Sequence, residues 1–487
     1  MKILLSSIVK FLILVLLTSA ACAQITFQKT FSKQQIGGFW SSAVSVQTFD
    51  GGYAVIAATG FVAPDWPNVF LLKTDENGTA QWTLDFGDTM QNIPLRLQQT
   101  SDSGLIISGM TARVEYNSGF QLLLSKVTSS GQLAWSKYYT QGGVSESPGY
   151  WVEQTRDGGF IVTGEAGTAD SACGPWTRRI YLLKTNSEGS FEWAKTFSAS
   201  INALGYCVQQ TSDNGYIITG VIGNSYTDDD IALIKTDSAG TLEWAKRIGG
   251  SSCDEGYCVR QTSDLGYLVT GYTKSFDSID FKGFLLKTDA SGSIQSFKTF
   301  EAGAEENGTD IELTSDGGYM IAGTRADTFA HGFIIKFDSV ENLQCSKSLS
   351  GIPSSVFSSI HSTNDGGFIL SGMGGEGIGG DGGIILVKTD DQGNTTCDMI
   401  HDATILLDEP YTDSSTFEEY SVNFTAYDWS VSVQQILVHQ SSACVATNTS
   451  EEEEINQSLQ IFPNPASDFI SVKFESRPQK ILLLSGE

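Results

Sequence analysis

Aromatic and acidic residues stand close together in several irregular segments of this 487-residue chain. An aromatic ring can stack on the apolar face of a sugar or of a peptide side chain, while a nearby carboxylate accepts hydrogen bonds. We select as candidate ligand contacts Trp66, Tyr116, Trp176, Tyr226, Asp228 and Asp230. Trp66 and Trp176 are the strongest candidates, because each lies beside a proline. The competing interpretation is that these rings pack each segment onto its own structural unit.

Metal binding and catalysis have little support in the sequence. Asp228 to Asp230 offer oxygen ligands that Ca²⁺ accepts, but their spacing differs from that of an EF-hand loop. The four histidines form no HExxH motif, and no GxSxG nucleophile motif is present. We therefore assign no catalytic residue, no metal ligand and no cofactor. A hydrolase that uses paired carboxylates on a polysaccharide remains the alternative.

The charge balance excludes some classes of partner. The chain has 56 acidic and 29 basic residues, and its net charge is −27. Nucleic-acid binding and docking to anionic membranes both depend on Lys and Arg, so we expect neither. Hydrophobic residues make up 40% of the chain, which is enough for a sizeable core.

The beginning of the chain has the features of a secretory signal peptide over residues 1–23. Lys2 and Lys10 supply positive charge, the apolar run from Phe11 to Leu17 follows, and Ala21 to Ala23 provide small residues for cleavage. This run is shorter than the ~20 residues that span a bilayer. We expect a mature chain without a transmembrane segment, secreted or held at the outer cell surface.

One unit is repeated seven times in the middle of the chain. A threonine recurs every 49 to 56 residues, at Thr48, Thr100, Thr155, Thr211, Thr262, Thr314 and Thr363. A lysine recurs with it, at Lys73, Lys126, Lys184, Lys235, Lys287, Lys336 and Lys388. Each unit contains four short β-rich runs separated by Asp- and Gly-rich turns. This predicts an all-β fold, a seven-bladed β-propeller of four-stranded blades over residues 24–398.

The ends of the predicted ring meet through the first strand of the mature chain. Phe27 to Phe31 match the fourth strand of a unit, Trp193 to Phe197, whereas the seventh unit lacks a match at that place. We therefore predict that the N-terminal strand completes the last blade as its outermost strand. Residues 399–448 do not match the repeat, and we expect a β-rich extension there.

The predicted topology divides the loops between two faces of the ring. The repetitive turns between strands one and two lie on one face, and the variable connections, which carry the candidate ligand contacts, lie on the other. A glutamine precedes the repeated threonine at Gln47, Gln99, Gln154, Gln210 and Gln261. We expect these glutamines to hydrogen-bond between blades and not to contact a ligand.

Cysteines have two predicted roles. Cys397 and Cys444 flank the extension and form our disulfide candidate, since exported proteins can form disulfides. Cys207 and Cys258 occupy the same position in adjacent units, and we expect them to pack as small apolar residues.

The end of the chain has an acidic linker at residues 449–458 and then a turn pattern, Phe462, Pro463, Asn464 and Pro465. Residues 459–487 resemble the opening of the C-terminal sorting domain of the Bacteroidota type IX (Por) secretion system, in a type A-like, truncated form. Residues from about 25 to 487 resemble secreted Bacteroidota proteins that join a propeller to such a domain, and the resemblance is specific in the repeats. This resemblance implies a partial β-sandwich-like sorting domain, the type IX machinery as a partner, and export.

The sequence therefore predicts an exported, non-catalytic binding or adhesion scaffold that presents its variable-loop face to a glycan or a protein. The alternative is a secreted enzyme that acts on polysaccharide with carboxylates on that face. A purely structural adhesion component is a third possibility.

Overall fold

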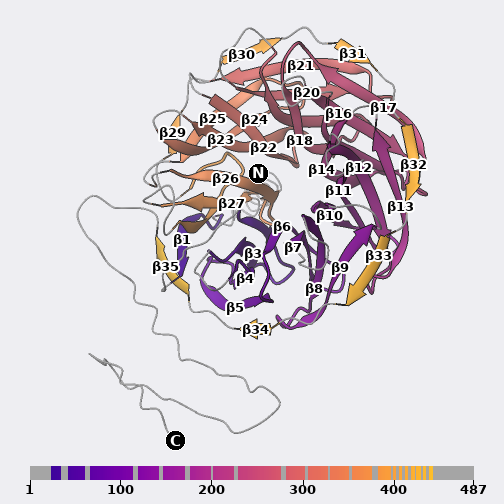
Figure 1. The fold of residues 1–487 in the computed structure, drawn as a ribbon. Coiled ribbons are helices and arrows are strands. Elements are labelled where there is room, and N and C mark those ends of the chain that lie inside the picture. The colour runs from indigo at the N-terminus through magenta and orange to yellow at the C-terminus, as the bar shows by residue number, and fades with distance from the viewer. Residues whose placement is uncertain are drawn as a thin grey trace, which may run out of the picture. The chain divides into compact units, whose positions relative to one another are not determined.

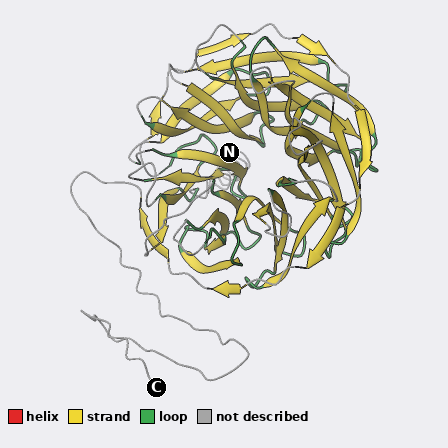
Figure 2. Ribbon diagram, viewed as in Figure 1, coloured by secondary structure: helices red, strands yellow, loops and turns green. Residues whose placement is uncertain are grey.

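The computed structural model describes residues 24–33, 42–60, 66–112, 119–141, 146–169, 176–198, 201–223, 229–275, 281–301, 305–326, 329–349, 352, 354–375 and 382–395, with seven short strands between 399 and 442. These residues form strands and turns (Figure 2). Within the described part of the chain there is no helix long and apolar enough to cross a membrane.

Seven antiparallel sheets lie in a ring around a central axis, which confirms the predicted seven-bladed β-propeller (Figure 1). Blade 1 contains β2 (Val44–Gln47), β3 (Tyr53–Ala58), β4 (Val69–Thr74) and β5 (Ala80–Gly87); blade 2, β6 (Asn92–Gln99), β7 (Leu105–Ala112), β8 (Phe120–Val127) and β9 (Leu133–Gln141); blade 3, β10 (Gly149–Gln154), β11 (Phe160–Ala169), β12 (Trp176–Thr185) and β13 (Phe191–Ser198); blade 4, β14 (Asn202–Gln210), β15 (Tyr216–Gly223), β16 (Asp229–Thr236) and β17 (Leu242–Gly249); blade 5, β18 (Asp254–Gln261), β19 (Tyr267–Thr273), β20 (Lys282–Thr288) and β21 (Ile294–Glu301); blade 6, β22 (Glu305–Leu313), β23 (Tyr319–Ala326), β24 (Ala330–Phe337) and β25 (Leu343–Leu349); and blade 7, β26 (Val356–Ser362), β27 (Phe368–Gly374), β28 (Gly383–Thr389) and β1 (Phe27–Lys33). The first strand named in each blade is its inner strand.

The hydrophobic core lies between neighbouring blades. The middle strands are nearly continuous aliphatic runs, because a sheet that is covered on both faces buries every side chain. β16 is buried at every position, and Ile218 of β15 and Leu233 of β16 are fully buried in a cluster that extends over several blades. Each such side chain contributes roughly 1.5–3 kcal/mol of burial free energy.

The ring closes as the sequence predicted. β1 pairs antiparallel with β28, from Phe27 opposite Lys388 to Phe31 opposite Ile384. A second link joins the first and last blades, because Gln47 accepts a hydrogen bond from the backbone N–H of Asn364 at 2.7 Å.

The expectation that β1 is the outermost strand of its blade is wrong, since a fifth strand lies outside each blade. These strands are β29 (Met399–His401), β30 (Ile405–Asp408), β31 (Thr412–Ser414), β32 (Glu418–Val422), β33 (Phe424–Asp428), β34 (Ser432–Gln434) and β35 (Val438–Ser442). They pair in chain order with β25, β21, β17, β13, β9, β5 and β1, all antiparallel. We call these seven strands the belt. The belt follows the rim of the ring in the reverse order of the blades (Figure 1).

A buried lysine supports the turn after the inner strand. In blade 4, the Asp213 carboxylate accepts hydrogen bonds from the Thr211 hydroxyl and the Gly215 N–H. The ammonium group of Lys235 lies 2.9 Å from Asp213 and donates to the carbonyl of Thr236 at 2.8 Å. Five other blades repeat the ion pair, as Lys73–Asp50, Lys126–Asp102, Lys184–Asp157, Lys336–Asp316 and Lys388–Asp365. We call the side of the ring with these turns the turn face and the opposite side the loop face.

The repeated glutamines link neighbouring blades, which confirms their predicted role. Each side-chain carbonyl accepts a hydrogen bond from a backbone N–H in the turn of the preceding blade. For example, Gln210 of blade 4 binds the N–H of Arg156 in blade 3 at 2.9 Å, and Gln261 binds that of Ser212 at 2.8 Å. These glutamines therefore link five of the seven pairs of neighbouring blades on the turn face, whereas blades 6 and 7 have Leu313 and Ser362 at this position.

Candidate functional site

A bulge interrupts the inner strand of six blades, five residues before the repeated threonine. The pairing with the second strand shifts there, and the extra residues are Leu95, Tyr150, Tyr206, Tyr257, Thr309 and Ser358. A bulge re-aims a side chain that regular alternation would place on a sheet face. All six of these residues line one pocket at the axis.

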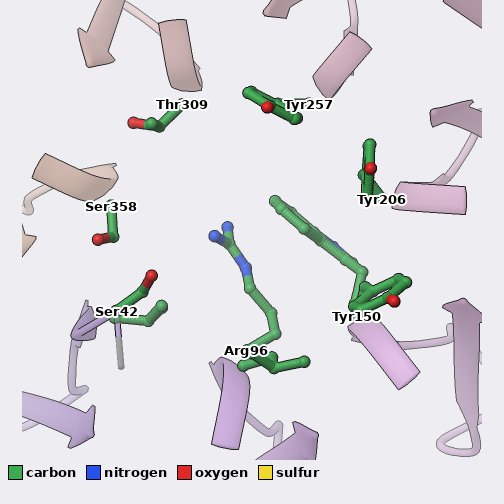
Figure 3. A pocket seen from close by; sticks show the side chains of 10 residues that line it. Ser42, Arg96, Tyr150, Tyr206, Tyr257, Thr309 and Ser358 are labelled. Carbon is green, nitrogen blue, oxygen red and sulfur yellow. The ribbon is translucent and has the colours of Figure 1, made fainter. Parts of the chain in front are cut away.

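This central pocket has a volume of about 220 Å³. It is lined by the six bulge residues together with Ser42, Val44, Arg96 and Trp151. Figure 3 shows side chains from every blade surrounding the pocket, with Arg96 extending toward its centre. Because each inner strand runs from the loop face to the turn face, the pocket lies in the half of the channel nearer the loop face.

The two sides of the pocket differ in chemistry. Blades 3 to 5 contribute tyrosines, whose rings form an arc with centroid distances of 5.7 Å from Tyr150 to Tyr206 and 5.4 Å from Tyr206 to Tyr257. The opposite side carries the hydroxyls of Ser42, Thr309 and Ser358. The pocket therefore has one aromatic side and one small, polar side.

Buried acids hold the tyrosine arc in place. The Tyr150 hydroxyl donates to Glu165 at 3.0 Å, and Arg178 lies 3.3 Å from the same carboxylate. Burial raises the pKa of Glu255, whose carboxylate accepts hydrogen bonds from Tyr206 and Tyr257 of the arc. These contacts fix the rings before any ligand arrives, which lowers the entropy cost of binding.

Arg96 forms the base of the pocket. Its guanidinium carbon lies 3.4 Å from the centroid of the Trp151 ring, a close cation–π contact. Its nitrogens also lie 3.1 Å from Asp310 and 3.2 Å from the ring of His361. Arg96 is only 5% exposed, so its charge is compensated inside the protein.

The charged network continues behind Arg96. Arg260 pairs with Asp310 at 3.1 Å and lies 3.8 Å from Glu312, which is 3.7 Å from His361. Two arginines thus face two carboxylates, and the cluster carries little net charge. Burial acts to raise the pKa of Asp310, but Arg96 and Arg260 outweigh it and hold that pKa at about 2. Asp310 is therefore an ionised anchor and not a proton donor.

Glu153 is a titratable acid on β10, two residues after the pocket residue Trp151, but it does not itself line the pocket. Burial raises its pKa to about 7, although the N–H of Gln210, 3.0 Å away, and nearby arginines oppose the shift. A carboxyl group with such a pKa can hold a proton near neutral pH. Among the described residues, no group of three or more His, Cys, Asp and Glu side chains could hold a metal ion.

The residues selected from the sequence do not line this pocket where the structure describes them. Trp66 precedes β4 on the loop face and is 45% exposed. Asp230 is buried on β16, where it forms an ion pair with Arg247 of β17. Trp176 begins β12, but its side chain lies outside the described residues, as do Tyr116, Tyr226 and Asp228.

The sulfur and sorting predictions have mixed outcomes. The disulfide candidate Cys397 and Cys444 and the sorting pattern Phe462, Pro463, Asn464 and Pro465 lie outside the described residues. Cys207 and Cys258 are fully buried in the hydrophobic core, as expected, but their sulfurs also have polar contacts that the sequence did not indicate. Their sulfurs lie among charged groups, with Cys258 2.9 Å from both Asp310 and Arg260.

Sequence reasoning missed the central pocket because it concentrated on the variable loops. The seven copies nevertheless contain a usable signal. Four residues before the repeated threonine, the seven copies carry six different residue types, which are Val44, Arg96, Trp151, Cys207, Cys258, Asp310 and Ser359. A position that varies within an otherwise repeated unit serves something other than the shared scaffold.

No protein-family model matches the chain, and no curated protein matches it in sequence. Solved structures resemble its fold at low identity. A protein of unknown function from Dyadobacter fermentans is 9% identical, with 75% of this chain and 99% of that chain covered and a TM-score of 0.43. The NanB sialidase from Streptococcus pneumoniae is 10% identical, with 74% and 70% covered and a TM-score of 0.41.

The extracellular domains 1–2 of Drosophila semaphorin 1a are also 10% identical. There 74% of this chain and 87% of that chain are covered, at a TM-score of 0.40. These similarities concern the fold and assign no activity to this chain.

Proposed function

We propose that this protein is a non-catalytic binding scaffold whose central pocket takes one ring of a neutral glycan. The observation that carries the proposal is the two-sided pocket, in which three tyrosines face Ser42, Thr309 and Ser358. A pyranose ring has apolar C–H faces that stack on aromatic rings and hydroxyls that hydrogen-bond to small polar groups.

Size and charge narrow the ligand class. The volume of about 220 Å³ is below the roughly 300–1,000 Å³ of sites for drug-sized ligands, so one ring fits and an oligosaccharide does not. The remainder of a longer glycan would extend over the loop face. A net charge of −27 repels polyanions, and the charge of Arg96 is already paired with Asp310. A neutral chain end is therefore favoured over an acidic one.

A glycan array followed by calorimetry tests the proposal. Neutral glycans should bind, and Tyr206→Ala should weaken binding at least tenfold because it removes the middle of the arc. Tyr206→Phe should bind nearly as well as the wild type, since it keeps the ring. Phe49→Ala is the matched control, because Phe49 is 65% exposed on the turn face. Absence of any bound glycan, or an unchanged affinity in Tyr206→Ala, would reject the proposal.

The alternative function is a secreted enzyme that acts on polysaccharide. Glu153 favours it, because it lies on β10 two residues after the pocket residue Trp151, and a pKa raised to about 7 suits a general acid. Asp310 does not supply the second carboxylate, since two arginines bind it. Release of new reducing ends from a neutral polysaccharide, abolished by Glu153→Gln with binding retained, would replace the binding proposal with this one.

The location of the protein is part of the proposal. Residues 1–23 support export, and the pattern around Phe462 to Pro465 supports recognition by type IX secretion machinery of Bacteroidota. A surface or extracellular scaffold would meet glycans there. Expression of the full chain in a type IX-competent host, with and without residues 449–487, checks this. Equal amounts of both forms outside the cell would contradict the sorting role.

A further inference from the structure

Two thiols lie side by side on the inner strands that carry two tyrosines of the arc. Cys207 on β14 and Cys258 on β18 occupy the same position in adjacent blades, and their sulfurs are 3.9 Å apart. Both side chains are fully buried. Each directly follows a pocket tyrosine in the chain, Tyr206 and Tyr257 respectively. Each cysteine is therefore the immediate neighbour in the chain of a residue that lines the pocket.

Charged and polar groups contact both sulfurs of the pair. Cys258 donates to Asp310 at 2.9 Å, and Arg260 lies 2.9 Å from the Cys258 sulfur and 3.8 Å from that of Cys207. The backbone N–H of Val259 also donates to Cys207 at 3.4 Å. Burial acts to raise the pKa of Cys207, but the contact with Cys258 and the charge of Arg260 outweigh it and lower that pKa. A thiolate at Cys207 is thus stabilised, and the thiolate is the reactive form.

We propose that Cys207 and Cys258 form a reversible oxidation site, at which a peroxide converts the two thiols into a disulfide between blades 4 and 5. Hydrogen peroxide is nearly as small as water and fits the pocket lined by Tyr206 and Tyr257, the residues that precede the two cysteines. The inference stands on the geometry of the thiols and does not depend on the glycan proposal.

The reaction balances without any other reagent. The Cys207 thiolate attacks one peroxide oxygen, the O–O bond breaks, and the leaving hydroxide takes up a proton to become water. The resulting sulfenic acid is attacked by the Cys258 sulfur, the S–O bond breaks, and the second hydroxide leaves with the proton of Cys258 as water. Two thiols lose two electrons in total, and one peroxide becomes two waters.

Oxidation would change the pocket as well as the thiols. A disulfide holds its sulfurs about 2.05 Å apart, so the pair must approach and draw β14 and β18 together. Cys258 would also lose its hydrogen bond to Asp310, the centre of the charged network. Because Tyr206 and Tyr257 pack edge to face, with ring centroids 5.4 Å apart, and directly precede the cysteines, the arc would shift with them.

The test uses the reduced full-length protein treated with hydrogen peroxide, then alkylated, digested and mapped by mass spectrometry. We expect a cross-linked peptide pair containing Cys207 and Cys258, lighter by two hydrogen atoms, that dithiothreitol separates. Cys207→Ser and Cys258→Ser should each abolish it, whereas Cys253→Ser should leave it intact. In Cys258→Ser, dimedone should label Cys207 as a trapped sulfenic acid.

Disulfide mapping of the oxidised wild-type protein tests the proposal even if the cysteine variants fail to fold. If peroxide oxidises other cysteines while Cys207 and Cys258 remain free for alkylation after unfolding, the proposal is overturned. The same holds if either cysteine pairs with a different partner. The change in tryptophan fluorescence on oxidation, reversed by dithiothreitol, provides a second readout beside the thiols, and its loss in Trp151→Phe assigns it to Trp151 among the nine tryptophans. An unchanged spectrum despite a mapped disulfide would contradict the predicted shift of the pocket.

Discussion

The turn face and the central pocket are built from the same seven inner strands, yet they follow opposite rules. On the turn face, threonine, aspartate, glycine and lysine recur from blade to blade with nearly the same contacts. Four or five residues earlier on the same strands, the side chains vary in charge and size around the ring, although blades 3 to 5 share a tyrosine and blades 4 and 5 share a cysteine. The repeated positions carry the scaffold, and the varied positions give the pocket its two sides. Equivalent substitutions should therefore have equal effects on the turn face and unequal effects in the channel.

The largest difference should appear at the position four residues before the repeated threonine. Asp310→Ala leaves Arg96 and Arg260 buried without their shared carboxylate, which costs about 3–5 kcal/mol. Ser359→Ala, at the same position in blade 7, removes one neutral hydroxyl and should cost about 1 kcal/mol. Chemical denaturation of both variants measures the difference. Equal losses would show that the channel is as uniform as the turn face.

A methyl group at the repeated glycine should be costly in every blade. In blade 4, a Cβ at Gly215 would lie 2.2 Å from the carbonyl oxygen of Thr236, so Gly215→Ala should destabilise by roughly 1–3 kcal/mol. Gly104→Ala and Gly367→Ala should cost similar amounts, since the same contact recurs at 2.6 and 2.1 Å. Thermal denaturation compares the three. If the stability losses of the three glycine variants differed as much as those of the channel variants, the turn face would not be uniform.

The turn carboxylates should make stability fall in acid. Burial acts to raise the pKa of Asp213, but the hydrogen bond from Thr211 and the ammonium group of Lys235 lower it to about 2. A lowered pKa means that the contribution is complete above about pH 4 and is lost as the pH falls toward 2. Asp213→Asn should cost about 1 kcal/mol at pH 7, because Asp213 is 55% exposed, and less at pH 2.5. Urea denaturation at the two pH values measures this. If Asp213→Asn destabilised the protein more at pH 2.5 than at pH 7, the predicted direction of the pH dependence would be wrong.

The smallest effect should be a gain in stability. The residue before the repeated glycine has positive φ in every turn, and blade 5 places Leu265 there at φ 68°. A branched side chain in this conformation is strained, and Leu265 is also 50% exposed. Leu265→Gly should raise stability by about 0.5–1 kcal/mol, as a small increase in melting temperature. Gly158→Asn is the control and should be nearly neutral, because Asn214 occupies the same place in blade 4.

The scaffold could be predicted from the sequence because it is repeated. Seven copies of Thr, Lys and the turn glycine set the number of blades, and the match between Phe27–Phe31 and a fourth strand located the closure. The interblade role of the glutamines followed from the same repetition. Where the strand pattern of one repeat is ambiguous, the aligned positions of the other repeats show where the strands lie.

The pocket and the belt could not be predicted in the same way. A bulge breaks the two-residue alternation of a strand, so Tyr150, Tyr206 and Tyr257 could not be placed in the channel from their spacing. The belt strands are three to five residues long and do not share a motif. Each belt strand pairs with the outer edge of a blade, and most of these blades are far away in sequence. The positions of these edges are set by the tertiary structure and cannot be inferred from local sequence patterns.

The order of the belt has a consequence for how the molecule comes apart. Its last strand, β35, pairs with β1 at five residues from Lys29 to Lys33, and β1 in turn pairs with β28. The strand that joins the two ends of the ring is thus held along both of its edges. To separate the first and last blades, β35 must first dissociate from β1. A single blade also cannot unfold independently while the belt pairs with its neighbours. This arrangement should lower the rate of unfolding more than it raises the free energy of unfolding. The folded protein should therefore be long-lived even where its free energy of unfolding is modest.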